Sequence, residues 1–116
     1  AFCSENEIAV TAYAPLGAPA RPWIEENSPV LLEDKTVLEI AKNHSKTPAQ
    51  VLIRFHIQRE VIAIPKSVKE HRIAENFNVF DFELSQDEMN SLCALECGFR
   101  GFTVAKFRGS AFYPFQ

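Results

Sequence analysis

The stretch that decides the fold is Val61-Ile62-Ala63-Ile64-Pro65-Lys66-Ser67. Its first four residues are all apolar, which is typical of a parallel strand that is covered on both faces. The proline ends the strand, and the capping-box pattern Ser67-Val68-Lys69-Glu70 predicts that a helix begins directly after it. Arg72 then lies on or near the first turn of that helix. Two cations, Lys66 and Arg72, beside a helix N-terminus at the carboxyl end of a strand predict a site for a phosphate monoester.

A second buried strand is predicted upstream, at Ile8-Ala9-Val10-Thr11-Ala12-Tyr13, because this stretch is short, β-rich and almost continuously apolar. Residues 1–7 before it have the character of the end of a helix. A loop rich in proline and glycine follows over residues 14–35, and loops of this length usually carry function. Trp23 in this loop is either a hydrophobic lid or a plug on the core of the fold.

Two helices are predicted between the strands, within residues 36–60. The first covers residues 36–43, and the capping box Thr47-Pro48-Ala49-Gln50 begins the second. Each helix has one apolar face. We expect Val37, Ile40, Ala41, Val51, Leu52 and Phe55 to face the core, and Gln50, Arg54 and Gln58 to face water.

The remainder of the chain covers the strand and helix start at 61–76, a segment at 77–97 and a tail at 98–116. Residues 77–84 form an irregular aromatic stretch that we expect to cover the core. The capping box Ser85-Gln86-Asp87-Glu88 predicts a helix that continues through Leu92 and Leu95. The tail lacks periodicity, so we expect an extended segment that packs over another part of the protein.

The order of elements predicts an α/β fold with parallel strands joined by helical crossovers. Two such strands cannot cover both of their faces or pair both of their edges, since a stable sheet needs more strands. We therefore interpret residues 1–116 as the last two βα units of a (β/α)₈ TIM barrel, with an extra helix and a C-terminal tail. Such a barrel needs roughly 250 residues, and its sites lie at the carboxyl ends of its strands.

Composition excludes several classes of protein. The net charge of −3 and the pI near 5.6 argue against a nucleic-acid binder. No apolar stretch approaches the length of a membrane span. Cys93 and Cys97 lie four residues apart, but without convergent histidines we expect reduced thiols and no metal site.

Several motifs occur in register with one known family. They are Val10-Thr11-Ala12-Tyr13-Ala14-Pro15-Leu16-Gly17, Arg21-Pro22-Trp23, Leu31-Leu32-Glu33-Asp34, Ala49-Gln50-Val51-Leu52-Ile53-Arg54-Phe55, Ile64-Pro65-Lys66-Ser67-Val68, Arg72-Ile73-Ala74-Glu75-Asn76 and Val79-Phe80-Asp81-Phe82. Together they resemble the aldo-keto reductases, most closely the aldose reductase and aldehyde reductase branch. The resemblance covers almost the whole chain and is weakest over residues 98–111.

The resemblance implies a cytoplasmic, monomeric barrel that transfers a hydride from NADPH to aldehydes and ketones. Tyr13 would stack on the nicotinamide, and the loop after it would close over the cofactor like a belt. Lys66 and Arg72 would hold the 2′-phosphate of the adenosine. The implied NADPH contacts are Tyr13, Ala14, Leu16, Ala18, Ile64, Pro65, Lys66, Ser67, Val68, Arg72, Glu75 and Asn76.

Two positions depart from the family. Ala14 stands where relatives commonly have a serine, so one phosphate hydrogen bond is absent. Lys69 stands where a threonine is usual, and it is either an extra cation near the phosphate or a solvated residue on the helix surface.

The resemblance also implies contacts with a small carbonyl substrate. Trp23 resembles a pocket-wall aromatic of the family, and Arg100, Phe102 and Val104 lie in the tail that sets substrate choice among relatives. Relatives often have a cysteine where Phe102 stands, so we expect a narrower and more apolar pocket. The alternative is that these residues only cover the mouth of the barrel.

No catalytic residue is assigned to this chain. In the family a tyrosine proton donor, a lysine, an aspartate and a histidine lie in the N-terminal two thirds of the barrel. His44, His56 and His71 are unclustered, and we assign none of them to catalysis.

Two other functions stay open. A recruited, non-catalytic relative such as a lens crystallin would keep the NADPH site, and carbonyl-dependent oxidation of NADPH distinguishes it from a reductase. A free-standing phosphate-binding domain is the third hypothesis. It would need the isolated chain to melt cooperatively, and we expect poor folding because two parallel strands are left uncovered.

Overall fold

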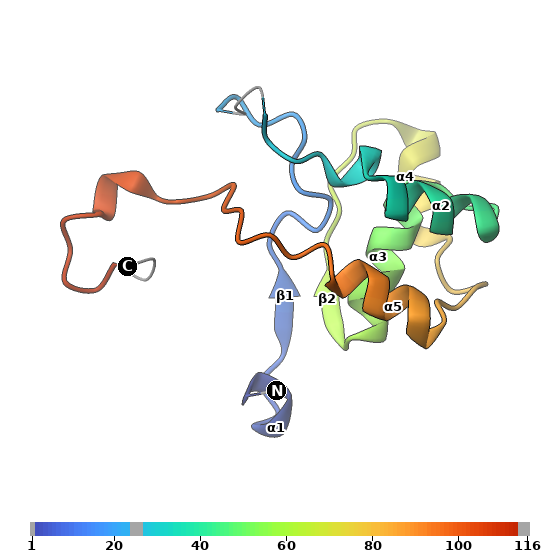
Figure 1. Cartoon of the computed structure of the whole chain (residues 1–116), viewed down its shortest axis with the longest axis horizontal. Coiled ribbons are helices and arrows are strands. Elements are labelled where there is room, and N and C mark those ends of the chain that lie inside the picture. Colours follow the sequence, from blue (N-terminus) through green and yellow to red (C-terminus); the bar gives the residue numbers. More distant parts are fainter. Residues whose placement is uncertain (1, 24–26, 114–116) are drawn as a thin grey trace.

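A computed structural model describes residues 2–23 and 27–113 of the chain (Figure 1). The chain alternates short strands with helices, as the sequence predicts. The elements are α1 (Phe2–Glu5), β1 (Val10–Ala12), the 3₁₀ turn η1 (Leu31–Glu33), α2 (Lys35–Asn43), α3 (Pro48–Gln58), β2 (Val61–Ala63), α4 (Glu70–Phe77), α5 (Gln86–Cys93) and the 3₁₀ turn η2 (Ala105–Phe107). The helix expected to run through Leu95 therefore ends at Cys93. No helix in the described ranges is long and apolar enough to cross a membrane.

The two strands pair in parallel, which confirms the prediction from their order along the chain. Val10 lies opposite Val61, and Ala12 lies opposite Ala63. As expected for two strands without the rest of a barrel, their faces are not fully covered in this chain, since Ile62 is 51% exposed and Ile64 is 63% exposed. The sheet of the described residues has two strands, so each strand keeps an unpaired edge and has few neighbours to cover it.

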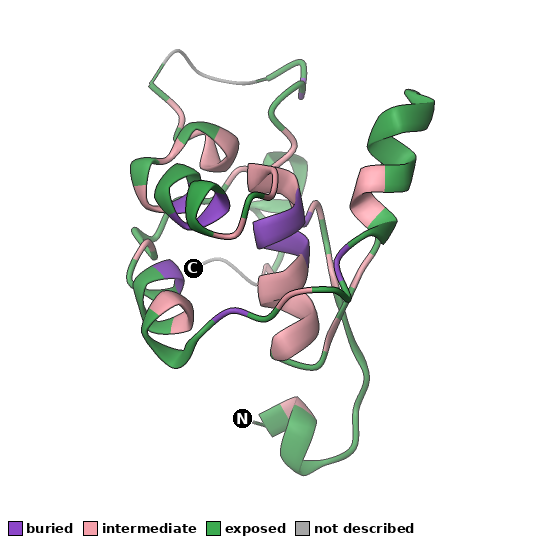
Figure 2. Ribbon diagram, turned by 90° about the vertical axis from the view of Figure 1, so that its right-hand side faces the viewer, coloured by how far each residue is buried: buried purple, intermediate pink, exposed green. Residues whose placement is uncertain are grey.

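The core lies between the helices and not on the sheet (Figure 2). One face of α2 and one face of α3 meet there, and α5 closes the cluster with the segment before it. The expected inward residues of α2 and most of those of α3 are confirmed, since Val37 and Val51 have no exposed surface, while Phe55 is half-buried against the cluster. The buried members of this cluster are Val37, Ile40, Ala41, Val51, Leu52, Leu84 and Leu92.

Side chains cap the N-termini of the three helices that form this core. Asp34 accepts from the backbone N–H of Thr36 at 2.8 Å at the start of α2. The capping boxes predicted at Thr47 and at Ser85 are both present, at α3 and α5. Each such cap supplies an acceptor to N–H groups that have no partner inside the helix.

The capping box predicted at Ser67 is wrong. Helix α4 begins at Glu70, its N-cap is Lys69, and no side chain caps it. Ser67 Oγ instead accepts from the N–H of Lys69 at 3.2 Å, within a turn that precedes the helix. The turn places Glu70 at the first helical position, where its side chain cannot reach back as the pattern requires.

The polar face of α3 is also not where the sequence pattern places it. Gln50 is only 4% exposed, and Arg54 and Gln58 are half-buried. Residues 78–84 return over this face, and Gln58 binds both backbone groups of Leu84, accepting from its N–H at 2.7 Å and donating to its carbonyl at 2.9 Å. The periodicity of one helix cannot show that a later segment will bury its polar side.

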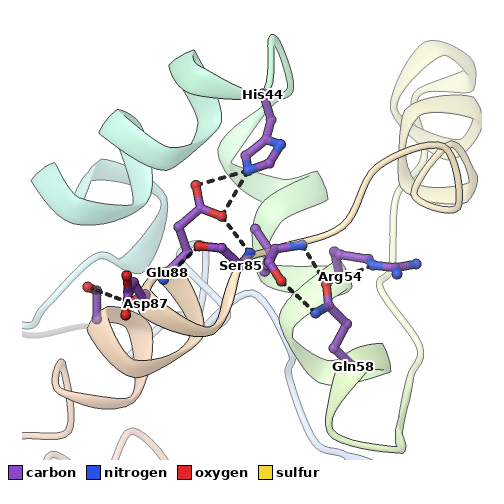
Figure 3. A network of polar contacts seen from close by, with 8 residues as sticks. His44, Arg54, Gln58, Ser85, Asp87 and Glu88 are labelled. Carbon is purple, nitrogen blue, oxygen red and sulfur yellow. Dashed lines mark hydrogen bonds and ion pairs between the residues drawn. The ribbon is translucent and has the colours of Figure 1, made fainter.

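A histidine and a glutamate join the end of α2 to the start of α5 (Figure 3). His44 Nε2 lies 2.9 Å from Glu88 Oε1. Burial alone raises the pKa of Glu88, but its hydrogen bonds with His44 and with the N–H of Ser85 outweigh burial and leave the pKa below its ordinary value. The pair thus links two helices of the core in a charged contact.

Candidate functional site

The two expected site regions meet at one edge of the sheet. Because β1 and β2 are parallel neighbours, the residues that follow them leave from the same end (Figure 1). Tyr13 follows β1, and Ile64 and Pro65 follow β2. Tyr13 is 79% exposed, so its ring is accessible at the carboxyl edge of the sheet.

The loop after β1 begins with a strained turn. Ala14 and Ala18 have φ of 53° and 47°, and Gly17 between them has φ of 76°. The left-handed region costs a residue with a Cβ about 1–2 kcal/mol. The N–H of Gly17 donates to the carbonyl of Ala14 at 2.8 Å, and Leu16 packs against the helical core, which holds the turn in place.

The expected phosphate-binding residues follow β2 and are accessible. Lys66, Val68 and Arg72 are exposed, and Ser67 is half-buried. Within residues 2–23 and 27–113, neither Lys66 nor Arg72 makes an ion pair, and the structure brings the two cations to the same helix start without joining them. Since no side chain caps α4, the N–H groups of its first turn also lack a protein partner from a cap.

Glu75 and Asn76 lie near the C-terminal end of α4, and Gln50 holds this end in position. Gln50 Nε2 donates to the carbonyl of Glu75 at 3.1 Å and to that of Asn78 at 2.8 Å. We expected Gln50 to face water, so this positioning role was missed. The signal was present in the capping box, because Oε1 of its glutamine accepts from Thr47 and leaves the amide nitrogen free to donate elsewhere.

Histidine 56 lies under the start of the long loop. His56 Nε2 donates to the carbonyl of Pro15 at 3.3 Å. Burial lowers the pKa of His56, and the charge of Arg59 lowers it further, against the hydrogen bond to Pro15, which raises it. A neutral His56 therefore supports the loop through a backbone contact.

Aromatic side chains join the long loop to the tail. The Phe102 ring lies 4.9 Å from that of Tyr13 and 5.7 Å from that of Trp23, both in edge-to-face geometry. Trp23 Nε1 donates to the carbonyl of Gly101 at 3.0 Å. Trp23 is 59% exposed, so it does not belong to the core of this chain.

A pocket of about 680 Å³ lies between the long loop and the tail. Tyr13, Ala14 and Gly17 line it from one side, and Phe99 and Phe102 line it from the other. Arg100 and Val104 do not line it. Phe99 is a lining residue that the sequence analysis missed, since a tail without periodicity offers no signal for the direction of its side chains.

No group of three or more histidine, cysteine, aspartate or glutamate side chains in the described part of the chain could hold a metal ion. Cys93 and Cys97 are free thiols, and both are exposed. At the start of α4 the polar groups are cations and backbone N–H groups, which suit an anionic ligand. The pocket between the long loop and the tail also has acidic residues in its lining, namely Glu33, Asp34 and Glu96.

Comparisons with known proteins agree with one another. The family described as "Aldo/keto reductase family" matches residues 1–96. A macaque protein, aldo-keto reductase family 1 member C1, is 41% identical over 116 residues, which are 99% of this chain and 36% of that protein. The zebrafish aldo-keto reductase family 1 member A1-A is 54% identical over 87 residues, covering 75% of this chain and 27% of that protein.

The fold agrees as well. The aldose reductase structure from Schistosoma japonicum superimposes with a TM-score of 0.84 at 45% identity, over 99% of this chain and 34% of that structure. The chain therefore corresponds to about a third of the length of the TIM-barrel proteins that it matches.

Proposed function

Because the chain belongs to the aldo/keto reductase family, we propose that it forms the C-terminal third of a barrel that reduces aldehydes and ketones with NADPH. In this proposal residues 1–13, 36–60 and 61–76 supply the last two βα units, residues 14–35 cover the cofactor, residues 77–97 cover the barrel, and residues 98–116 form part of the substrate pocket. The resemblance is also the basis for proposing a cytoplasmic monomer.

The observation that carries the choice of NADPH is the pair of accessible cations at the uncapped start of α4. Lys66 and Arg72 have no acidic partner among the described residues, and a 2′-phosphate would supply one. NADH lacks this phosphate, so it would leave both cations unmatched. Lys69, as the N-cap of α4, adds a third positive charge to the same helix start.

The other residues of the site have roles that fit this orientation. Ile64, Pro65 and Val68 present apolar surface next to the cations, where the adenosine would lie, and Glu75 and Asn76 follow one turn further along α4. Ala14, Leu16 and Ala18 belong to the strained turn that would pass over the pyrophosphate. The exposed ring of Tyr13 is available to stack on a planar group at the edge of the sheet.

NADPH, when bound, supplies the hydride that reaches the carbonyl carbon, and the carbonyl oxygen takes a proton from an acid outside this chain. This chain orients the reaction and excludes water from it. Phe102 lines the pocket, and Trp23 contacts its ring from outside the lining, so both would contribute an apolar wall for the substrate. Arg100 and Val104 do not line this pocket, and in this proposal they would reach the substrate from the tail.

The test is a double substitution, Lys66→Ala with Arg72→Ala, in the protein that carries this chain. Each charge-assisted hydrogen bond contributes about 1.5–3 kcal/mol, so we expect the affinity for NADPH to fall by about 100-fold or more while that for NADH changes little. Fluorescence titration measures both. The pair Lys42→Ala with Arg59→Ala removes the same charge from exposed positions elsewhere and serves as the control. Equal losses for the two cofactors would refute the assignment.

A further inference from the structure

Arg21 carries a charge that is buried within the chain. It is 7% exposed, and it makes no ion pair with any residue that the structure describes. A guanidinium that is removed from water must find acceptors or an aromatic face, because an unmatched buried charge is strongly unfavourable. The contacts of Arg21 therefore show which segments of the chain it joins.

On one side Arg21 binds its own loop. Its Nη1 donates to the carbonyl of Gly17 at 3.0 Å and to that of Ala18 at 3.2 Å. These carbonyls belong to the strained turn that begins the long loop. The guanidinium thus completes the turn that the proposed function places over the cofactor.

On the other side Arg21 contacts the tail. Its Cζ lies 5.6 Å from the centre of the Phe99 ring, in a cation–π arrangement. A Cβ built on Gly101 would lie 3.7 Å from the same Cζ, so the tail backbone passes directly beside the guanidinium. The nearby hydrogen bond from Trp23 to Gly101 joins the same two segments.

We infer that Arg21 is a positioning residue that couples the long loop to the tail, so that closure of the loop over NADPH also orders the wall of the substrate pocket. The inference rests on the proposed function, since the loop must close over a cofactor for the coupling to act. The contacts of Arg21 in this structure are with Gly17, Ala18 and Phe99. When the turn at Gly17 and Ala18 is held in place, Arg21 restricts the motion of Phe99 and Gly101. The neighbouring Phe102 is then restricted as well.

Hydrogen exchange followed by mass spectrometry, on the protein that carries this chain with and without NADPH, tests the coupling. In the unmodified protein we expect NADPH to slow exchange in both residues 14–23 and residues 98–104, by about threefold or more in the tail. Arg21→Met removes the bonds to Gly17 and Ala18 as well. We expect NADPH still to slow exchange in the loop of this variant, because the loop contacts the cofactor directly, and no longer to slow it in the tail. Phe99→Leu, which removes the ring from the opposite side, gives the same result if Arg21→Met fails to fold.

Arg59→Met is the matched control, because Arg59 lies 4.9 Å over the Phe55 ring in the same kind of contact but outside the site. It leaves the protection of both segments unchanged. Tail protection that survives in both Arg21→Met and Phe99→Leu would overturn the coupling, as would an unmodified protein in which NADPH protects the loop alone. Absence of protection in both segments of the unmodified protein would overturn the proposed function, and the coupling with it.

Discussion

The helical part of the chain buries its apolar side chains and caps its helices more completely than the sheet edge does. Helices α2, α3 and α5 supply most of the buried core, and each has a capping side chain at its N-terminus. The sheet edge, made of β1, β2 and α4, contributes no residue to this core, and α4 has no capping side chain. The helical part thus pairs its polar groups and buries its apolar side chains within the chain. The sheet edge instead exposes apolar surface, cations and N–H groups.

This difference means that the helical part contributes most of the stability of the chain, whereas the sheet edge holds the groups that are available for binding. Apolar burial in the helical part stabilises the fold at about 25 cal/mol per Å². The exposed groups of the sheet edge contribute little to the chain alone, because Ile62, Ile64 and Phe77 keep more than half of their surface in water. They are available to a ligand and to neighbouring strands and helices of a barrel. Four experiments test this difference between the helical part and the sheet edge.

The largest expected effect is the loss of a core side chain. Leu52, on α3, is 5% exposed, and Leu52→Ala should lower the free energy of unfolding by about 2–5 kcal/mol, since it leaves a cavity. Ile62→Ala on β2 should lower it by less than about 1 kcal/mol, because half of that side chain is already in water. Urea unfolding of the chain, followed by the circular dichroism of its helices, compares them, since the helical core contains no residue of the uncovered strands. Equal losses would mean that the sheet edge is as well packed as the helices.

The second effect concerns the polar link that Gln50 makes between the two regions. Gln50→Leu removes both hydrogen bonds from α3 to the end of α4, and with them the capping-box bond from the N–H of Thr47. We expect a loss of about 1–3 kcal/mol in the same unfolding assay. Gln86→Leu, which removes only an exposed bond to Asn90, is the control and should be almost neutral. A neutral Gln50→Leu would show that α4 does not depend on α3.

The third effect compares two serines that have the same pattern in the sequence. Ser85 caps α5, so Ser85→Ala should cost about 1 kcal/mol of stability. Ser67 caps no helix, and Ser67→Ala should change stability by less than about 0.5 kcal/mol in the absence of cofactor. Thermal unfolding of the two variants measures the difference. A similar loss in both would mean that α4 is capped after all.

The smallest effect is the pH dependence of the His44–Glu88 contact. The folded pKa of Glu88 lies below its ordinary value of 4.5, so the folded state binds fewer protons than the unfolded state. The contribution of Glu88 is therefore fully present above this value and is lost as the pH falls through the folded pKa. Both side chains are about one fifth exposed, which keeps the contribution small.

Chemical unfolding at a series of pH values, on Glu88→Gln and on the exposed control Glu83→Gln, checks this contribution. Glu88→Gln should flatten the decline of stability on the acid side, and Glu83→Gln should leave it intact. A decline that is unchanged in Glu88→Gln would show that another carboxylate causes it.

The sequence predicts the parts of this fold that depend on neighbours along the chain. The parallel strands, the helices between them and the capping boxes at Thr47 and Ser85 follow from local patterns, and the structure confirms them. The failures occur where distant segments meet. Gln50 looks like a solvent-facing residue until residues 75–78 supply its acceptors, and Ser67 matches a capping box that a preceding turn prevents.

The same division holds for the candidate site. The sequence predicts that Tyr13, Lys66 and Arg72 lie beyond the carboxyl ends of two strands. The order of residues along the chain is enough for this, once the strands are recognised. Only the tertiary structure decided that Arg21 is buried, that Trp23 meets Gly101 across 78 positions, and that Phe99 lines the pocket. These contacts join segments that are far apart in the sequence, and the local pattern of one segment does not predict contact with the other. They arise because the tail, which follows α5, passes beside the long loop, where the Arg21 guanidinium contacts the Phe99 ring and Trp23 binds the carbonyl of Gly101.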